Sequence, residues 1–180
     1  PRGYDALADC GVTDELVPAV LKELKEPQNK DDQEGAVAAG LLLSLVERPE
    51  VLPLAEVYLK DTRPPARAAA AYVIARASSQ GPLAAQAALA LQETNWKDSY
   101  YGTTLMLAAV QRLRKDQKFD LDRLQVNRVD VNLLLYWLFG REKADKPQFV
   151  DDYERGAVFG DRFEQGVRLD GLQLAMDWIA

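Results

Sequence analysis

The chain has 180 residues, with 22 Lys and Arg against 28 Asp and Glu and a formal net charge of -6, which suits one domain with its own hydrophobic core. It contains no His and one Cys, which excludes Ser-His-Asp and Cys-His catalysis, His-ligated metals, internal disulfides and multi-cysteine zinc sites within this sequence. The net acidity argues against a nucleic-acid partner whose phosphates the protein neutralises. The abundance of Ala and Leu predicts an all-α protein.

Six helical segments are predicted in the first two thirds of the chain. Apolar residues recur with helical spacing in each segment, and prolines or a Gly-Pro pair separate several of them. The segments cover about residues 16–24, 33–47, 49–59, 66–77, 83–91 and 99–115. The side chains expected at helix N-caps are those of Thr13, Thr62 and either Asp98 or Ser99. Pro64 and Pro65 suit the first turn of a helix, where a missing N–H costs nothing.

The six segments pair off in a repeating pattern. The second members of the pairs start at intervals of roughly 31 and then 35 residues, a period that indicates an α-solenoid of two-helix units. One such unit cannot bury its apolar face alone, whereas three stacked units can. Shifting the sequence by about 31 residues places Leu42 on Val73 and Leu43 on Ile74, a match of character rather than identity.

The stretch from residue 61 to residue 74 resembles the second helix of a HEAT repeat. The positions that carry the resemblance are Asp61, Ala66, Arg67, Ala70, Ala71, Val73 and Ile74. The other two units lack the Arg and have Gly35-Ala36 and Gly102-Thr103 near the equivalent place, so the resemblance rests on one well-matched unit. It implies a short right-handed α-solenoid of helical hairpins. Tetratricopeptide-like pairs are the alternative, although their Trp-Leu-Gly-Tyr signature is missing.

Three regions are expected along the chain: residues 1–12 as an N-terminal lead-in, 13–115 as three HEAT-like helical hairpins, and 116–180 as an irregular helical C-terminal cap or interaction region. The last region includes an apolar stretch, Val131 to Phe139, far shorter than the roughly 20 residues that span a bilayer, so no membrane insertion is expected. The sequence begins Pro1-Arg2 without Met, which we interpret as a processed or excised piece. A cytoplasmic location is expected, and a removed signal peptide stays open as the alternative.

The acidic and glycine-rich clusters of the C-terminal region match no chemical motif. Asp120-x-Asp122 and Asp151-Asp152-Tyr153-Glu154 lack the Gly and terminal Glu spacing of an EF-hand loop, so solvated acidic turns explain them. The glycines between residues 156 and 171 form neither a dinucleotide-binding fingerprint nor a P-loop, and helix breaking explains them. The sequence therefore predicts no catalytic residues, no cofactor and no metal site.

A binding surface is predicted on the second helices of the three pairs, which line the concave face of a HEAT-like stack. The predicted binding residues are Arg67, Arg76, Trp96, Tyr101 and Arg112. Guanidinium groups suit carboxylate or phosphate recognition, and aromatic side chains at a loop suit anchoring of a partner. Two alternatives stay open: Arg67 pairs with Asp61, as the HEAT family's Arg and Asp commonly do, and the aromatic side chains pack beneath the loop.

The leading functional expectation is a non-enzymatic scaffold that binds a protein or peptide through this concave face, with no nucleic-acid partner. One alternative is a small acidic inhibitor, such as an immunity protein that neutralises a basic toxin or nuclease. A contiguous acidic patch would favour it, built from Asp120, Asp122, Asp151 and Asp152. The other alternative is a HEAT-like enzyme such as a bilin lyase, which needs a pigment-sized cavity that contains carboxylates. The partner's identity and the oligomeric state stay open.

Overall fold

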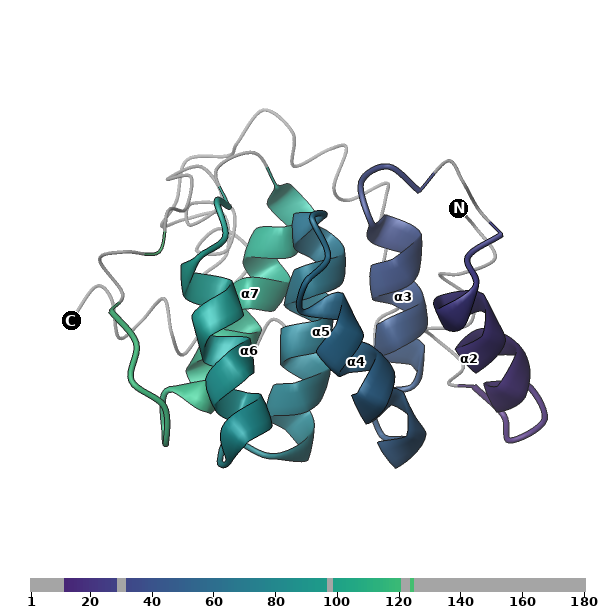
Figure 1. Ribbon diagram of the computed structural model, residues 1–180, viewed down its shortest axis with the longest axis horizontal. Coiled ribbons are helices and arrows are strands. Elements are labelled where there is room, and N and C mark those ends of the chain that lie inside the picture. Colours follow the sequence, from purple (N-terminus) through teal and green to yellow (C-terminus); the bar gives the residue numbers. More distant parts are fainter. Residues whose placement is uncertain (1–11, 29–31, 97–98, 121–123, 125–180) are drawn as a thin grey trace, which may run out of the picture.

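The computed structural model describes residues 12–28, 32–96, 99–120 and 124. In these ranges it contains six α-helices, one 3₁₀ turn and no strand, so the described part of the chain is all-α, as the composition predicts. The elements are α2 (Val17–Lys25), α3 (Ala36–Ser44), η1 (Pro49–Val51), α4 (Leu52–Tyr58), α5 (Pro64–Ala77), α6 (Pro82–Gln92) and α7 (Tyr100–Leu113) (Figure 1). Each coincides with a predicted segment to within a few residues. The predicted lead-in up to residue 11 and most of the predicted cap lie outside the described residues.

The start of α5 follows from its two prolines. Pro64 and Pro65 occupy the first turn, as predicted, because they lack only N–H groups that have no partner within the helix. The prediction of Thr62 as the N-cap is wrong, since the N-cap is Arg63. The backbone N–H of Arg63 donates to the carboxylate of Asp61 at 2.8 Å, so the acid two residues earlier orders this turn.

The other two expected N-caps have different outcomes. Ser99 caps α7, and its Oγ accepts the backbone N–H of Gly102 at 3.2 Å, as predicted. Thr13 is not the N-cap of α2, because this helix begins at Val17. The backbone carbonyl of Thr13, rather than its side chain, accepts the N–H groups of Leu16 and Val17 at 2.9 and 3.2 Å.

Polar contacts at the helix ends show how α2 and α4 lie relative to each other. Asp14, which precedes α2, forms an ion pair with Arg48, which precedes η1 and α4. At the other end, the hydroxyl of Tyr58 in α4 donates to the backbone carbonyl of Leu24 in α2 at 2.9 Å. The residues before the two helices contact each other, and so do the residues at their C-terminal ends. The α2 and α4 helices therefore run in the same direction.

The α5 helix runs opposite to its neighbours in the chain. Arg67 in its first turns bonds to Thr94, which follows the end of α6, at 2.7 Å. Arg76 in its last turn forms an ion pair with Glu47, which precedes α4. The chain therefore reverses direction between α4 and α5 and again between α5 and α6, so α5 forms an antiparallel pair with each of these neighbours (Figure 1).

The α5 helix is the centre of the described structure, and it packs against α3, α4, α6 and α7. Every residue from Pro65 to Ala75 except Arg67 is buried. Most of these are alanines, so neighbouring helices approach α5 from several sides at once. A helix that is apolar around its whole circumference has to be enclosed, and α5 is.

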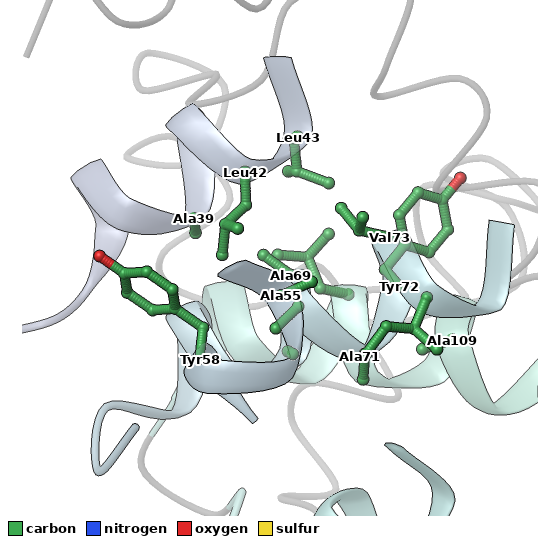
Figure 2. Packing of buried hydrophobic residues seen from close by; sticks show 14 of the residues in the cluster. Ala39, Leu42, Leu43, Ala55, Tyr58, Ala69, Ala71, Tyr72, Val73 and Ala109 are labelled. Atoms are coloured by element: carbon green, nitrogen blue, oxygen red, sulfur yellow. The ribbon is translucent and has the colours of Figure 1, made fainter. Parts of the chain in front are cut away.

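The α3 and α7 helices, which pack on either side of α5, also contain continuous runs of buried residues. Leu42 and Leu43 of α3, Val73 of α5 and Ala109 of α7 are all fully buried, and Figure 2 shows them around the same core. In α3 the buried run covers residues 38–44, and in α7 it covers 105–110. The α3, α5 and α7 helices are therefore closed on all sides over these runs.

Candidate functional site

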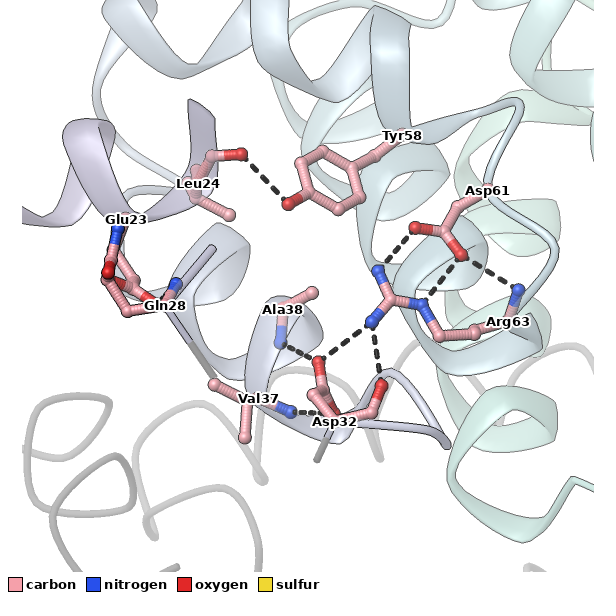
Figure 3. A network of polar contacts seen from close by, with 9 residues as sticks. All are labelled: Glu23, Leu24, Gln28, Asp32, Val37, Ala38, Tyr58, Asp61 and Arg63. Carbon is pink, nitrogen blue, oxygen red and sulfur yellow. Dashed lines mark hydrogen bonds and ion pairs between the residues drawn. The ribbon is translucent and has the colours of Figure 1, made fainter. Parts of the chain in front are cut away.

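Three charged side chains meet where the turn before α3 contacts the turn before α5 (Figure 3). Arg63 contacts the carboxylate of Asp61 with two nitrogens: Nε donates to Oδ1 at 2.9 Å and Nη2 donates to Oδ2 at 2.6 Å. Its Nη1 donates to the backbone carbonyl and the Oδ2 of Asp32, at 2.7 and 3.2 Å. The planar guanidinium thus joins the turns of two successive hairpins, a geometry that Lys cannot reproduce.

Asp32 also holds the first turn of α3. Its Oδ1 accepts the backbone N–H of Val37 at 3.1 Å, and its Oδ2 accepts that of Ala38 at 3.0 Å. First-turn N–H groups have no acceptor within the helix, and the helix dipole favours a negative charge there. The residue at the N-cap is Gly35, whose φ of 77° brings the chain from Asp32 into the helix.

Burial and charge act in opposite directions on this network. Burial raises the pKa of the Asp61 carboxyl, but the hydrogen bonds and positive charge of Arg63 outweigh it and hold that pKa below its ordinary value. The bond to Asp61 raises the pKa of Arg63. The side chains of Arg63, Asp61 and Asp32 are 26%, 14% and 8% exposed, so these charges are largely withdrawn from water and depend on one another.

A hollow of about 240 Å³ lies beside this network and opens to solvent. It is lined by Glu23, Pro27, Asp32, Val37, Ala38, Leu41, Tyr58 and Arg63. Its polar groups already have partners within the protein: Tyr58 donates to a backbone carbonyl, and Glu23 accepts the backbone N–H of Gln28 at 2.8 Å. The network therefore holds two hairpins together and presents no unpaired acid or base.

A second contact of the same kind involves Arg67, one of the predicted binding residues. Its Nε donates to the backbone carbonyl of Asp61 at 2.8 Å, and its Nη1 donates to the hydroxyl of Thr94 at 2.7 Å. The alternative of an ion pair with the Asp61 carboxylate is wrong in this detail, because Arg63 occupies that carboxylate. Arg67 instead joins the turn before α5 to the turn before α7.

Contacts also join the turns at the other edge of the molecule, where Arg76 pairs with Glu47. The carboxylate of Asp116, after α7, accepts hydrogen bonds from the hydroxyl of Ser79 and, at 3.1 Å, from the side-chain amide of Gln80. The first pair links the last turn of α5 to the turn before η1, and the second links the turn after α5 to the residues that follow α7. Arg76 therefore forms a contact between hairpins, like Arg67, but at the opposite end of α5.

Trp96 is fully buried, and its indole N–H donates to the backbone carbonyl of Leu91 at 2.9 Å. The prediction that it is an exposed anchor is wrong, and the alternative that it packs beneath the loop is confirmed. Gly102 leaves room for its ring, since a Cβ there would lie 3.1 Å from the Trp96 Cζ3. Tyr101 belongs to α7, but its side chain lies outside the described residues.

The predicted row of arginines is not a single surface. Arg67 and Arg76 lie nine positions apart on α5, which at about 100° per residue places them on opposite sides of the helix. Arg112 lies over the buried ring of Tyr72, with its guanidinium carbon 5.8 Å from the ring centroid. Within the described part of the chain, the side chains of residues 38–44 in α3 and 105–110 in α7 are also buried rather than exposed. The reason for the error is that helical periodicity shows which side chains share a helix face but not what covers that face.

The sequence patterns do not single out Arg63, whose guanidinium joins Asp61 in its own turn to Asp32 in the turn before α3. The signal was present: Asp61 and Arg63 stand two residues apart in front of the proline pair that starts α5. At this spacing the Asp61 carboxylate accepts both the backbone N–H of Arg63 and its guanidinium, so the two side chains fold back on each other in the turn.

Several other predictions fall largely outside the described residues. Of the four acids of the predicted patch, only Asp120 is described, and its backbone N–H donates to the side chain of Gln92 at 3.1 Å. The described residues contain no group of three or more His, Cys, Asp or Glu side chains that could hold a metal ion. No helix among them is long and apolar enough to cross a membrane.

Comparison with known proteins gives no relative for this chain: no family model, no curated protein and no solved structure matches it. The class of the protein is therefore stated from its own structure. Its described part is an all-α arrangement of antiparallel hairpins whose turns are joined by polar contacts.

Proposed function

We propose that the chain is a non-enzymatic protein-binding module, built on a short HEAT-like stack of helical hairpins. The alternating helix directions support the stack, as do the contacts of α5 with both α3 and α7. The polar contacts at both edges add to this support, because they join successive hairpins and hold their surfaces in fixed positions.

The observation that carries the binding role is a pair of exposed aliphatic side chains on α4 and α6. Val57 is 64% exposed and Leu89 is 56% exposed. Each stands two residues after a buried alanine and two residues before a buried leucine, so the two helices present an apolar side chain at the same place in their sequences. The buried neighbours are Ala55 in α4 and Leu59 directly after it, and Ala87 and Leu91 in α6.

The two helices hold these side chains on rigid supports. Both α4 and α6 pack against α5, so the sides that carry Val57 and Leu89 face away from it. Removing an exposed Val or Leu from water on binding is worth about 1.5–3 kcal/mol for each side chain. An exposed pair on fixed helices suits recognition of another protein better than chemistry on a small molecule.

This proposal places the binding surface on α4 and α6 rather than on α3, α5 and α7, which we call the inner helices. The inner helices are enclosed, and Arg67 and Arg76 already form contacts within the protein. The acidic-inhibitor alternative depends mainly on residues outside the described part, and the carboxylates of Glu23 and Asp32 at the hollow near Arg63 already have partners within the protein. No observation favours either alternative over binding.

Affinity capture from the native lysate tests the proposal with three forms of the full chain. They are the wild type, a Val57→Glu/Leu89→Glu variant, and a Gln33→Glu/Ala77→Glu variant that places the same charges on exposed sites elsewhere. We expect a partner that the wild type and the control retain and the Val57→Glu/Leu89→Glu variant loses, with unchanged circular dichroism. A partner retained equally by all three forms, or no partner at all, contradicts the proposal.

A further inference from the structure

The solvent side of α4 and α6 repeats a short apolar pattern. In α4 an exposed Pro53 stands four residues before Val57, and in α6 an exposed Ala85 stands four residues before Leu89. Residues four apart lie on the same face of a helix, one turn above the other. Each helix therefore presents a two-residue apolar stripe to solvent, and because both helices run opposite to α5, the two stripes run in the same direction.

The stripes are accompanied by acidic side chains without ion-pair partners in the described part of the chain. Glu93 lies four residues after Leu89 and continues the stripe of α6. Glu50 and Glu56 lie beside the stripe of α4. All three are exposed, and the ion pairs found among the described residues use other acids. Two exposed lysines lie near these acids: Lys60 follows α4, and the backbone carbonyl of Lys118 accepts the side-chain amide of Gln92, next to Glu93, at 3.5 Å. The three glutamates outnumber these two lysines, so the surface carries a net negative charge.

We propose that this outer face binds a basic amphipathic helix of a partner protein, an inference that rests on the proposed binding function. The outer face consists of Glu50, Pro53, Glu56, Val57, Ala85, Leu89 and Glu93. The apolar side of the partner helix packs on Val57 and Leu89, as ridges of one helix pack into the grooves of others. Its Lys and Arg side chains face the three glutamates, which adds electrostatic attraction and selects against acidic segments.

A synthetic pair of helical peptides tests this choice of partner. One peptide is amphipathic with leucine and lysine, and the other has glutamate at every lysine position. We measure the binding of each to the full chain by fluorescence anisotropy, at low and at high salt. We expect the leucine–lysine peptide to bind more tightly than the leucine–glutamate peptide, and the difference to shrink at high salt because exposed charges are screened.

Two charge-reversal variants separate the outer face from the net charge of the protein. Glu56→Lys/Glu93→Lys reverses charges on the outer face, and Glu15→Lys/Glu34→Lys makes the same change in net charge at exposed positions outside it. We expect the first variant to weaken binding of the leucine–lysine peptide roughly tenfold and the second to change it by less than about twofold. Equal weakening by both variants overturns the inference, because binding then follows net charge alone.

The remaining outcomes distinguish this inference from the proposed function. If both peptides bind alike and only Val57→Glu/Leu89→Glu abolishes binding, the apolar surface binds but the preference for a basic partner is overturned. If neither peptide binds, the inference is overturned as well. The proposed function is decided separately, by whether affinity capture finds a partner that depends on Val57 and Leu89.

Discussion

At the scale of single residues, Arg63 forms the most shielded ion pair between the first two hairpins. Its guanidinium forms charged hydrogen bonds with Asp61 and Asp32, and both carboxylates are mostly withdrawn from water. Removing a cation from such a site leaves two buried negative charges that face each other without compensation. Arg76 makes the contrasting case, because its partner Glu47 has a side chain that is 73% exposed.

We expect Arg63→Ala to lower the free energy of unfolding by about 2–4 kcal/mol, because it leaves partly buried charges unpaired. The matched change Arg76→Ala should cost less than about 1 kcal/mol, since exposed ion pairs contribute little. Urea denaturation of both variants and the wild type measures the difference. Equal losses for the two variants would show that Arg63 has no special place in the fold.

Asp61 gives the network a defined dependence on pH. Its pKa in the folded protein lies below the ordinary value of 3.8. A depressed folded pKa stabilises the fold at pH values above the unfolded pKa, and this contribution is lost as the pH falls through the folded pKa. We therefore expect the stability difference between the wild type and Asp61→Asn to be largest near neutral pH and to shrink below about pH 4. Thermal unfolding across this pH range checks the expectation, and a constant difference would contradict it.

The residue scale is also where sequence reasoning succeeds least. The sequence patterns point to Arg67 rather than Arg63, because both arginines lie close to Asp61 in the sequence and only the folded contacts show which one reaches its carboxylate. Sequence reasoning also treated Trp96 as a surface anchor, although the alternative of burial was stated. An aromatic residue at a helix–helix turn has the same local sequence whether the next hairpin covers it or not.

At the scale of helices, apolar periodicity and proline placement predict where the helices of the described part lie along the chain. The positions of the six described helices follow to within a few residues from apolar spacing, from Pro64 and Pro65 at the start of α5, and from the Ser99 cap of α7, although the predicted caps Thr13 and Thr62 are wrong. These signals are local, and local signals determine where helices begin and end. Which side of a helix is covered by other elements depends on contacts that are distant in the sequence. Local signals therefore do not show that α3, α5 and α7 are enclosed.

Two glycines, one at the N-cap of α3 and one within the helix, differ in the space that their neighbours leave for a Cβ atom. Gly40 lies within the helix, and a Cβ there would meet nothing within 4 Å. Gly35 has a φ of 77°, and a Cβ there would lie 2.8 Å from the Cβ of Arg63. We expect Gly40→Ala to raise the free energy of unfolding by about 0.5–1 kcal/mol through helix propensity. Gly35→Ala should lower it by at least about 1 kcal/mol through strain.

Chemical denaturation of the two glycine variants measures both effects under one condition. Changes of the same sign in both variants would contradict the account of α3. The comparison is internally controlled, because each variant adds the same methyl group to the same helix.

The alanines of α5 set the distance between helices. Ala69 is fully buried in the core shown in Figure 2, whereas Ala77 at the end of the same helix is exposed. We expect Ala69→Leu to lower the free energy of unfolding by about 1–3 kcal/mol, because the added atoms force neighbouring helices apart. Ala77→Leu should change it by less than about 0.5 kcal/mol. Similar melting temperatures for the two variants would show that the core has room around α5.

At the scale of the whole molecule, the described hairpins are joined at both edges and around α5. Contacts from Arg63 and Arg67 join the turns at one edge, and those of Arg76 and Asp116 join turns at the other. The inner helices are buried by this arrangement, while α4 and α6 present exposed apolar side chains. Within the described part of the chain, the proposed outer face therefore follows from the packing of α4 and α6 on α5 rather than from any one motif.

The most direct measurement is photo-crosslinking from defined positions of the full chain in its native lysate. A photoreactive amino acid replaces Val57, Leu89 or, as the control, Ala77, which is exposed but lies outside the outer face. The account predicts that the forms labelled at Val57 and at Leu89 crosslink to the same partner and that the form labelled at Ala77 does not. Crosslinks from Ala77 alone, or different partners for the two outer positions, would contradict it.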